Sequence, residues 1–164
     1  MTHSTPIPAE EFEIVQLTLP SVIRPPNAVP FTLTLTVGSH ALGSIIAHVS
    51  NVEYVRWIDR IEELHGVSIG LSRATLLARQ RMWFVLRHEI DYLCEVFEAD
   101  SLGCATWISR RGRTTIQRET VIWHRGREAE VCRASSRWAY IDLNTRKPVQ
   151  APEIELQLLQ PLAP

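Results

Sequence analysis

The sequence contains little lysine and no long apolar run. Lys147 is the single lysine, and arginine supplies the other sixteen basic side chains. The net charge of −1 gives no overall basic surplus of the kind that favours nucleic-acid binding, so we expect no nucleic-acid partner. No apolar stretch reaches the length of about 18 residues that a membrane-spanning helix needs, so we expect no transmembrane segment.

Cysteine is scarce as well. Cys94, Cys104 and Cys132 are odd in number and form no CxxC pair, which argues against a disulfide framework and a cysteine-rich zinc site. The histidines are scattered without an HxxxH pair, so we expect no metal site and no cofactor. Residues 1–11 carry acid and proline where a signal peptide has a basic head and an apolar stretch. Together these features predict a cytoplasmic protein with reduced thiols.

The 164 residues suffice for one domain with a buried core, and the content of 45% apolar and 21% charged residues is that of an ordinary folded chain. Six of the ten prolines lie within residues 1–30. Because proline fixes φ and removes a backbone donor, we expect an extended arm there, with at most short pieces of strand.

Two segments have clear local patterns. Residues 31–37 alternate apolar side chains with threonine, which predicts a half-buried strand. Ser50 and Glu53 have the spacing of a capping box, and apolar residues recur after them at helical spacing. We therefore predict a helix over residues 51–65, wrapped by the rest of the domain and ended by Gly66.

After this helix the pattern predicts a short helix over residues 72–79 and then strands. The four strands are expected at residues 82–93, 101–110, 114–123 and 128–141, with turn residues between them. A proline-spaced tail follows from residue 148. One strand, one long helix and four further strands give an α+β fold, in which an antiparallel sheet of about five strands wraps the helix.

One motif lies at the start of the long helix. Residues 47–57 read AHVSNVEYVRW, and this run resembles the helix entry of the 4-hydroxybenzoyl-CoA thioesterase-like branch of the hotdog-fold superfamily. Residues 84–92 and 138–148 resemble that family's second strand and its last strand. The matching positions of the helix entry are His48, Val49, Asn51, Tyr54 and Trp57.

The resemblance covers residues 31–152 and implies a hotdog domain there, flanked by an arm at 1–30 and a tail at 153–164. It further implies hydrolysis of an acyl-CoA or acyl-carrier-protein thioester. Such proteins form homodimers or homotetramers with active sites at the subunit interface. We expect these substrates and this self-association here.

Two positions depart from the family pattern. Ala47 replaces a glycine, and Ser44 stands where the family has its catalytic aspartate. A serine has no carboxylate and cannot act unaided as a general base at neutral pH. Two alternatives to hydrolysis therefore stay open: a hotdog protein that binds acyl-CoA or acyl carrier protein with little or no hydrolysis, and a dehydratase or cyclase in which His48 acts on a carrier-bound chain.

Thioester hydrolysis needs donors for an oxyanion and a group that directs water. Unpaired amides in the first turn of a helix, at Val49 and Ser50 and onward, fit the first need. His48, Asn51 and Ser44 are candidates for holding the water, although each also fits a structural hydrogen bond at the turn.

Acids for the reaction are expected elsewhere in the chain. Glu89 or Asp91, on the strand after the helices, is a candidate that a neighbouring subunit can supply. Glu62 and Glu63, later on the long helix, are candidates by analogy with another hotdog branch. Ordinary solvated or capping positions are the alternative for these acids.

Substrate binding is expected from arginines and aromatic residues. Guanidinium groups bind phosphate well, so either of two basic turns can hold the CoA phosphates: Arg110, Arg111 and Arg113, or Arg125 and Arg127. Tyr54 and Trp57 are candidates for the acyl pocket, with core packing as the alternative.

Overall fold

The computed structural model describes residues 11–23 and 29–161, and most of them form one curved antiparallel sheet. Its strand order is β1-β2-β4-β5-β6-β3, with β7 beside β6. The strands are β1 (Phe12–Ile14), β2 (Phe31–Thr36), β3 (Arg81–Tyr92), β4 (Ser101–Arg111), β5 (Thr115–His124), β6 (Ala129–Asp142) and β7 (Lys147–Pro148). The five long strands lie within one residue of their predicted ends. β1 lies in the arm for which we expected at most short pieces of strand, and β7 was not predicted, because two residues are too few to show a periodicity.

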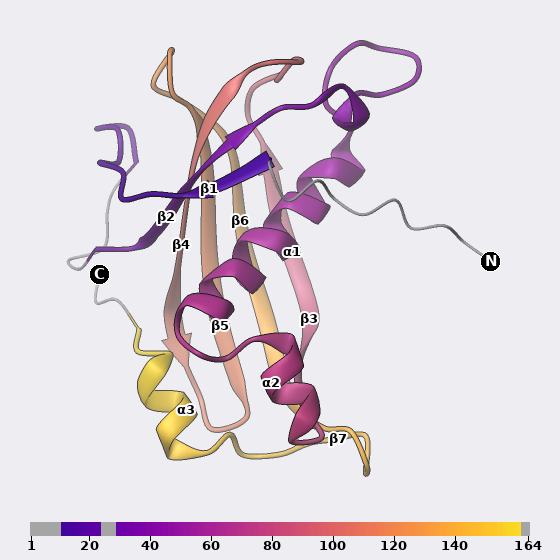
Figure 1. Cartoon of the computed structure of the whole chain (residues 1–164), viewed down its shortest axis with the longest axis vertical. Coiled ribbons are helices and arrows are strands. Elements are labelled where there is room, and N and C mark those ends of the chain that lie inside the picture. Colours follow the sequence, from indigo (N-terminus) through magenta and orange to yellow (C-terminus); the bar gives the residue numbers. More distant parts are fainter. Residues whose placement is uncertain (1–10, 24–28, 162–164) are drawn as a thin grey trace.

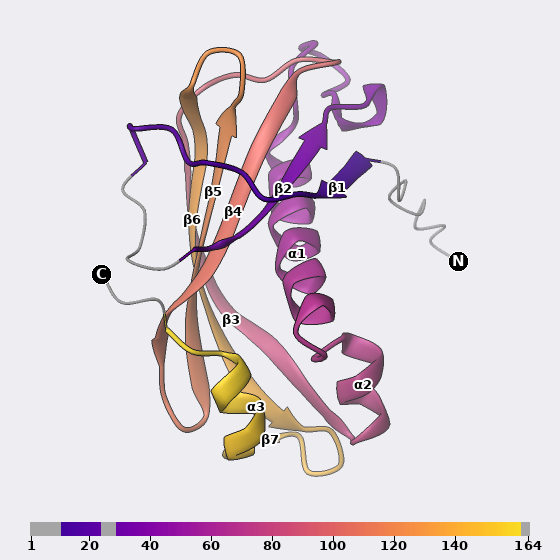
Figure 2. The ribbon, with the colours of Figure 1, turned by 60° about the vertical axis from the view of Figure 1, so that its left-hand side comes forward.

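Three α-helices accompany the sheet in the described part of the chain. The long helix α1 (Asn51–Ser68) crosses one face of the sheet, and the strands curve around it (Figures 1 and 2). The predicted hotdog arrangement is therefore confirmed. Helix α2 (Arg73–Ala78) follows, with the side chain of Ser72 accepting a hydrogen bond from the Thr75 amide. Helix α3 (Glu153–Leu158) lies in the segment for which we expected only a tail.

The start of α1 differs from the predicted capping box. Ser50 is the N-cap residue, but its side chain makes no capping bond, and the Glu53 amide donates instead to the Ser50 carbonyl. The Glu53 carboxylate bonds to Arg56 at 3.0 Å and lies near His40. Tertiary partners therefore replace the local partner that the sequence spacing suggested. At the other end Gly66 lies inside the helix, which continues to Ser68.

The buried face of α1 is only partly the expected one. Tyr54, Trp57, Ile58 and Ile61 pack against the inner face of the sheet, whereas Val52 is 69% exposed. A second cluster packs at the far end of the helix, where α2 and α3 close the sheet. Its members include Leu71, Leu76, Ile108, Trp138, Leu156 and Leu159.

The two edges of the sheet differ in length. β1 pairs with β2 over three residues, whereas β3 is a twelve-residue edge that pairs only with β6 among the described strands. Phe84, Val85 and Leu86 are each more than 40% exposed on this edge, beside an irregularity in the pairing after Val85. Within the described residues, no helix combines the length and the apolar character that crossing a bilayer requires.

Candidate active site at the start of the central helix

A tight turn presents His48 just before α1. The Gly43 amide donates to the His48 carbonyl at 2.8 Å, and Leu42 and Val49 form an isolated β-bridge. The loop between them projects from the molecule, with Ile45 96% exposed and Ile46 58% exposed. The turn is thus fixed at its base, and His48 is held at that base.

His48 has an acidic partner that sequence reasoning missed. Its Nδ1 lies 3.0 Å from Oε1 of Glu95, in the segment that follows β3. The same segment is fixed to the helix entry, because the Val49 amide donates to the Val96 carbonyl at 2.9 Å. A carboxylate on Nδ1 selects the imidazole tautomer with a free Nε2 lone pair, which is the state that a general base needs.

The free amides of α1 are not the ones we expected. The Val49 amide is bonded to Val96, and the Ser50 amide donates to the Ala41 carbonyl at 3.1 Å. Both are therefore unable to bind an oxyanion, which corrects the assignment of this role to Val49 and Ser50. The amides of Asn51 and Val52 take part in none of the hydrogen bonds of the described residues. They are the donors that the first turn offers to a ligand.

A cavity of about 180 Å³ opens beside these groups. Its lining comprises His48, Val49, Asn51, Tyr54, Tyr92, Leu93, Cys94 and Glu95. Tyr54 and Tyr92 contact each other edge to face, with ring centroids 5.3 Å apart. Trp57 is fully buried beneath Tyr54 and is not part of the lining.

Other sequence candidates lie apart from this cavity. Ser44 is exposed in the projecting loop. Glu89 pairs with Arg87 and lines a different hollow, because alternate residues of β3 face opposite sides of the sheet. Tyr92, on the opposite face to Glu89, is the β3 residue that reaches the cavity. Within one chain Glu89 is therefore separated from His48.

The two basic turns lie at opposite ends of the sheet. Arg110, Arg111 and Arg113 lie at the β4–β5 turn, where Arg111 donates to the Leu156 carbonyl and Arg113 to Gln150 at 3.0 Å. This turn is near α3 and far from the start of α1 (Figure 1).

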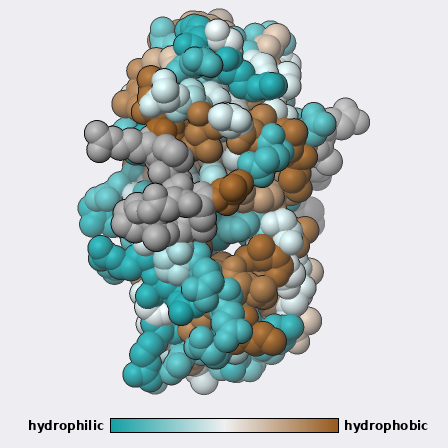
Figure 3. Space-filling model, turned by 90° about the vertical axis from the view of Figure 1, so that its left-hand side faces the viewer, coloured by the Kyte–Doolittle hydropathy of each residue, from teal (hydrophilic) through white to brown (hydrophobic). Residues whose placement is uncertain are grey.

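The β5–β6 turn, with Arg125 and Arg127, lies at the helix-entry end. Arg127 lies 3.4 Å from the Glu95 carbonyl and 3.8 Å from a carboxylate oxygen of Asp100. The end of the molecule that carries this turn is mostly hydrophilic (Figure 3).

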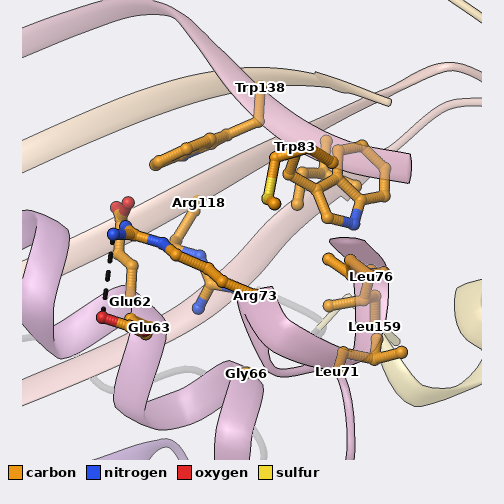
Figure 4. A pocket seen from close by; sticks show the side chains of 12 residues that line it. Glu62, Glu63, Gly66, Leu71, Arg73, Leu76, Trp83, Arg118, Trp138 and Leu159 are labelled. Atoms are coloured by element: carbon orange, nitrogen blue, oxygen red, sulfur yellow. Dashed lines mark ion pairs between the residues drawn. The ribbon is translucent and has the colours of Figure 1, made fainter. Parts of the chain in front are cut away.

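A second, smaller pocket of about 60 Å³ lies at the other end of α1, between the helix, α2, α3 and the sheet. Glu62 and Arg118 form one side of it, and Leu71, Leu76 and Leu159 form the other (Figure 4). The indoles of Trp83 and Trp138 also line it, and Arg73 pairs with Glu63 beside them at 3.7 Å.

Glu62 is the unusual group of this second pocket. Its carboxyl oxygens are buried and have no hydrogen-bond partner among the described residues. Burial raises the pKa of Glu62 to about 7, against the opposing effect of the Arg118 guanidinium. Arg118 itself donates to Nδ1 of His65 at 2.6 Å, and burial lowers the pKa of His65 to about 3, which keeps that ring neutral.

Glu62 cannot act on a group bound at the helix entry. Glu62 lies eleven positions after Asn51, and at about 1.5 Å of rise per residue this places the two roughly 16 Å apart along the helix axis. A general base must lie within hydrogen-bonding reach of the proton that it takes. The two pockets of α1 are therefore chemically separate.

Comparison with known proteins decides the family. The sequence profile of the thioesterase-like superfamily matches residues 44–159, which is more than half of the chain. The protein belongs to the thioesterase-like superfamily. No curated protein matches the sequence.

Solved structures share the fold of this thioesterase-like protein. A 1,4-dihydroxy-2-naphthoyl-CoA thioesterase from Synechocystis superposes with a TM-score of 0.73 at 16% identity, covering 79% of this chain and 94% of that one. The Staphylococcus aureus protein SAV2348, solved in complex with CoA, gives 0.74 at 17% identity, with coverages of 88% and 85%. An acyl-ACP thioesterase from Bacteroides thetaiotaomicron gives 0.66 at 20% identity, with coverages of 73% and 49%. At these identities the likeness concerns the fold alone.

Proposed function

We propose that this thioesterase-like protein hydrolyses an acyl thioester of CoA or acyl carrier protein in the cavity at the start of α1. Three features support the proposal. The chain belongs to the thioesterase-like superfamily, the cavity contains the His48–Glu95 pair, and the amides of Asn51 and Val52 are free beside it. The His48–Glu95 pair carries the argument, because it supplies a base where Ser44 leaves the family's aspartate absent.

The groups of the cavity suit each step of hydrolysis. The thioester carbonyl oxygen accepts hydrogen bonds from the Asn51 and Val52 amides, where the helix dipole also favours negative charge. Nε2 of His48 takes a proton from a water molecule as the water oxygen attacks the carbonyl carbon. Glu95 accepts the Nδ1–H bond and stabilises the imidazolium that forms. The tetrahedral intermediate then expels the thiolate, which takes the proton from His48, and the products are a carboxylic acid and a thiol.

Substrate contacts follow from the same geometry. Tyr54 and Tyr92 offer aromatic surface to the acyl group, and Asn51 is exposed at the mouth to orient the thioester or the water. Arg125 and Arg127 are nearer to this mouth than the Arg110–Arg113 turn. We therefore assign the phosphate-binding role to the β5–β6 turn within one chain.

The proposal is tested by thiol release from short, long and aromatic acyl-CoAs. We compare the wild type with His48→Ala and Glu95→Gln. The matched control is His88→Ala, which removes another histidine hydrogen bond, 2.8 Å to Ser136, outside the cavity. Loss of general-base catalysis lowers kcat by about 10²–10⁴-fold. We expect a decrease of this size for His48→Ala, a smaller one for Glu95→Gln, and near-wild-type kcat for the control.

Two results would redirect the assignment. Equal kcat in the wild type and His48→Ala would refute the role of His48. Binding of acyl-CoA or acyl carrier protein with no thiol release from either would support the non-hydrolytic alternative, which the absence of an aspartate at Ser44 favours. Release of water from a β-hydroxyacyl substrate would instead indicate a dehydratase.

Replacing Ser44 by aspartate tests whether the active site uses a carboxylate at position 44, as the family pattern does. Because Ser44 is exposed and does not line the cavity, we expect Ser44→Asp to leave kcat within about threefold of the wild type, well inside the range that a general base contributes. A tenfold or larger increase would show that a carboxylate at position 44 reaches the substrate. Such an increase would also show that Glu95 does not take the place of the family's aspartate.

We further propose a homodimer in which two β3 edges pair. A long apolar edge strand is a site for adding another strand, and Phe84, Val85 and Leu86 remain exposed on it. Light scattering of the wild type and of Leu86→Arg tests this idea. A dimer that dissociates in the variant supports it, and a wild-type monomer contradicts it.

A further inference from the structure

Three titratable side chains cluster near the start of α1, outside both the cavity of His48 and the pocket of Glu62. Glu11 lies directly before β1, His40 lies in a short 3-10 helix (Ser39–Ala41), and Glu53 lies in the first turn of α1. One donor atom from each lies within 4.8 Å of the others. The residues are far apart in sequence, which is why their spacing gave no metal motif.

Both carboxylates of this cluster are buried and incompletely bonded. Glu11 is 7% exposed and Glu53 is 3% exposed. Among the described residues, the two carboxylate oxygens of Glu11 make no hydrogen bond, and Oε1 of Glu53 makes none either. Removing a carboxylate from water is strongly unfavourable unless a positive charge and hydrogen bonds compensate. Arg56 reaches only Oε2 of Glu53, so three buried acceptor oxygens make no hydrogen bond, and the His40 ring is the cationic group that the ion pairs place near two of them.

The spacing of the three donors fits a small divalent ion. In a tetrahedral zinc site with bonds of about 2.1 Å, neighbouring ligand atoms lie about 3.4 Å apart. Nε2 of His40 lies 3.4 Å from Oε1 of Glu11 and 3.8 Å from Oε1 of Glu53. The two carboxylate oxygens lie within 4.8 Å of each other, so closing that gap to about 3.4 Å brings all three atoms into coordination. His40 is partly exposed, which leaves an entry path and a fourth position for water.

We propose that Glu11, His40 and Glu53 bind one divalent transition-metal ion, for which Zn²⁺ is the best match. One imidazole and two carboxylates form a ligand set that zinc accepts. Arg56 donates a hydrogen bond to Oε2 of Glu53 and leaves Oε1 for the ion. Residues around a metal site commonly orient a ligating carboxylate in this way. The ion joins the segment before β1 to the first turn of α1, so that its binding stabilises the fold.

The test uses the full-length protein after chelation and dialysis. Zinc binding is measured by calorimetry, Co²⁺ binding by its visible spectrum, and stability by the Tm with and without zinc. We expect one zinc per chain, a tetrahedral cobalt spectrum and a higher Tm in zinc. His40→Ala removes a partly exposed ligand, so the variant is expected to fold. It should lose at least about 100-fold in affinity, the upper end of what an outer-shell change costs.

His124→Ala is the matched control, because its ring also faces a carboxylate but does not belong to the cluster. Glu11→Gln is a second ligand variant that retains the shape of the side chain. The proposal is overturned if the wild type binds no more zinc than His40→Ala. It is also overturned if His124→Ala loses zinc as His40→Ala does, because the ion would then lie elsewhere.

Discussion

Glu62 makes the stability of the protein depend on pH in a direction that can be worked out. Its pKa rises from the ordinary value of 4.5 to about 7 because the carboxyl is buried. The folded state therefore retains a proton that the unfolded chain loses between pH 4.5 and pH 7. In this window the folded state binds more protons, so the contribution of Glu62 to stability decreases as pH rises. The difference between a pKa of 4.5 and one of about 7 corresponds to about 3 kcal/mol.

The variant Glu62→Gln isolates this contribution. Glutamine resembles the protonated carboxyl and does not titrate. We therefore expect the free energy of unfolding of Glu62→Gln, minus that of the wild type, to increase by about 3 kcal/mol from pH 4.5 to pH 7.5. Urea unfolding at several pH values measures it. His65 acts in the opposite sense over part of the range, because its lowered pKa favours folding as pH rises, but it is present in both proteins and cancels.

The control is Glu63→Gln, which removes the next carboxylate along the same helix. The Glu63 carboxylate pairs with Arg60 at 3.0 Å. A change common to both variants would reflect the loss of any carboxylate from α1. The reasoning fails if the difference between Glu62→Gln and the wild type stays constant within about 1 kcal/mol over the whole range.

Two further predictions concern packing and thiol reactivity. A Cβ added at Gly103 would lie 2.3 Å from the indole of Trp123. Because overpacking is destabilising, Gly103→Ala should lower the free energy of unfolding by about 1–3 kcal/mol. Urea unfolding measures this change. Cys94 is exposed in the helix-entry cavity, whereas burial raises the pKa of the Cys132 thiol to about 12 and that of Cys104 as well. A thiol reagent should therefore modify one cysteine in the native protein and three after unfolding, and CoA esters should slow the native reaction.

Each of these predictions has a clear contrary outcome. Gly126→Ala serves as the control for packing, since its added Cβ would meet nothing nearer than 3.4 Å; equal stability of the two alanine variants would contradict the clash. Reaction of two or three thiols at the same rate in the native protein would show that the buried cysteines are accessible. Modification of Cys94 at an unchanged rate in saturating CoA ester would place the ligand outside the cavity.

The sequence predicts elements well where the signal is local and repeated. The alternation of residues 31–37 and the length of the later strands follow from a period of two, and the start of α1 follows from Ser50 and the apolar residues after it. α3 was missed because six residues after Pro152 give too short a pattern, and its stability comes from Leu156 and Leu159 packing on the far end of the sheet. The protruding Val52 and the buried Glu62 likewise depend on which side of the helix the sheet covers.

The candidate site was predictable only in part. The run from His48 to Tyr54 identified the helix entry, and the structure brings its side chains to one cavity. Glu95 has no local pattern, since it lies in an irregular segment positioned by the Val49–Val96 bond. Glu53 was assigned to a cap because spacing alone could not reveal His40 beside it. Long-range pairing decides these positions.

The unequal edges of the sheet bear on the homodimer proposed above. Among the described strands, two copies joined through their twelve-residue β3 strands would leave the three-residue β1 strand at each outer end. Such a short strand offers few backbone groups for a further chain, so we expect strand addition to stop at two copies in that dimer. The same asymmetry that makes one edge suited to association would then protect the proposed dimer against growth into fibres.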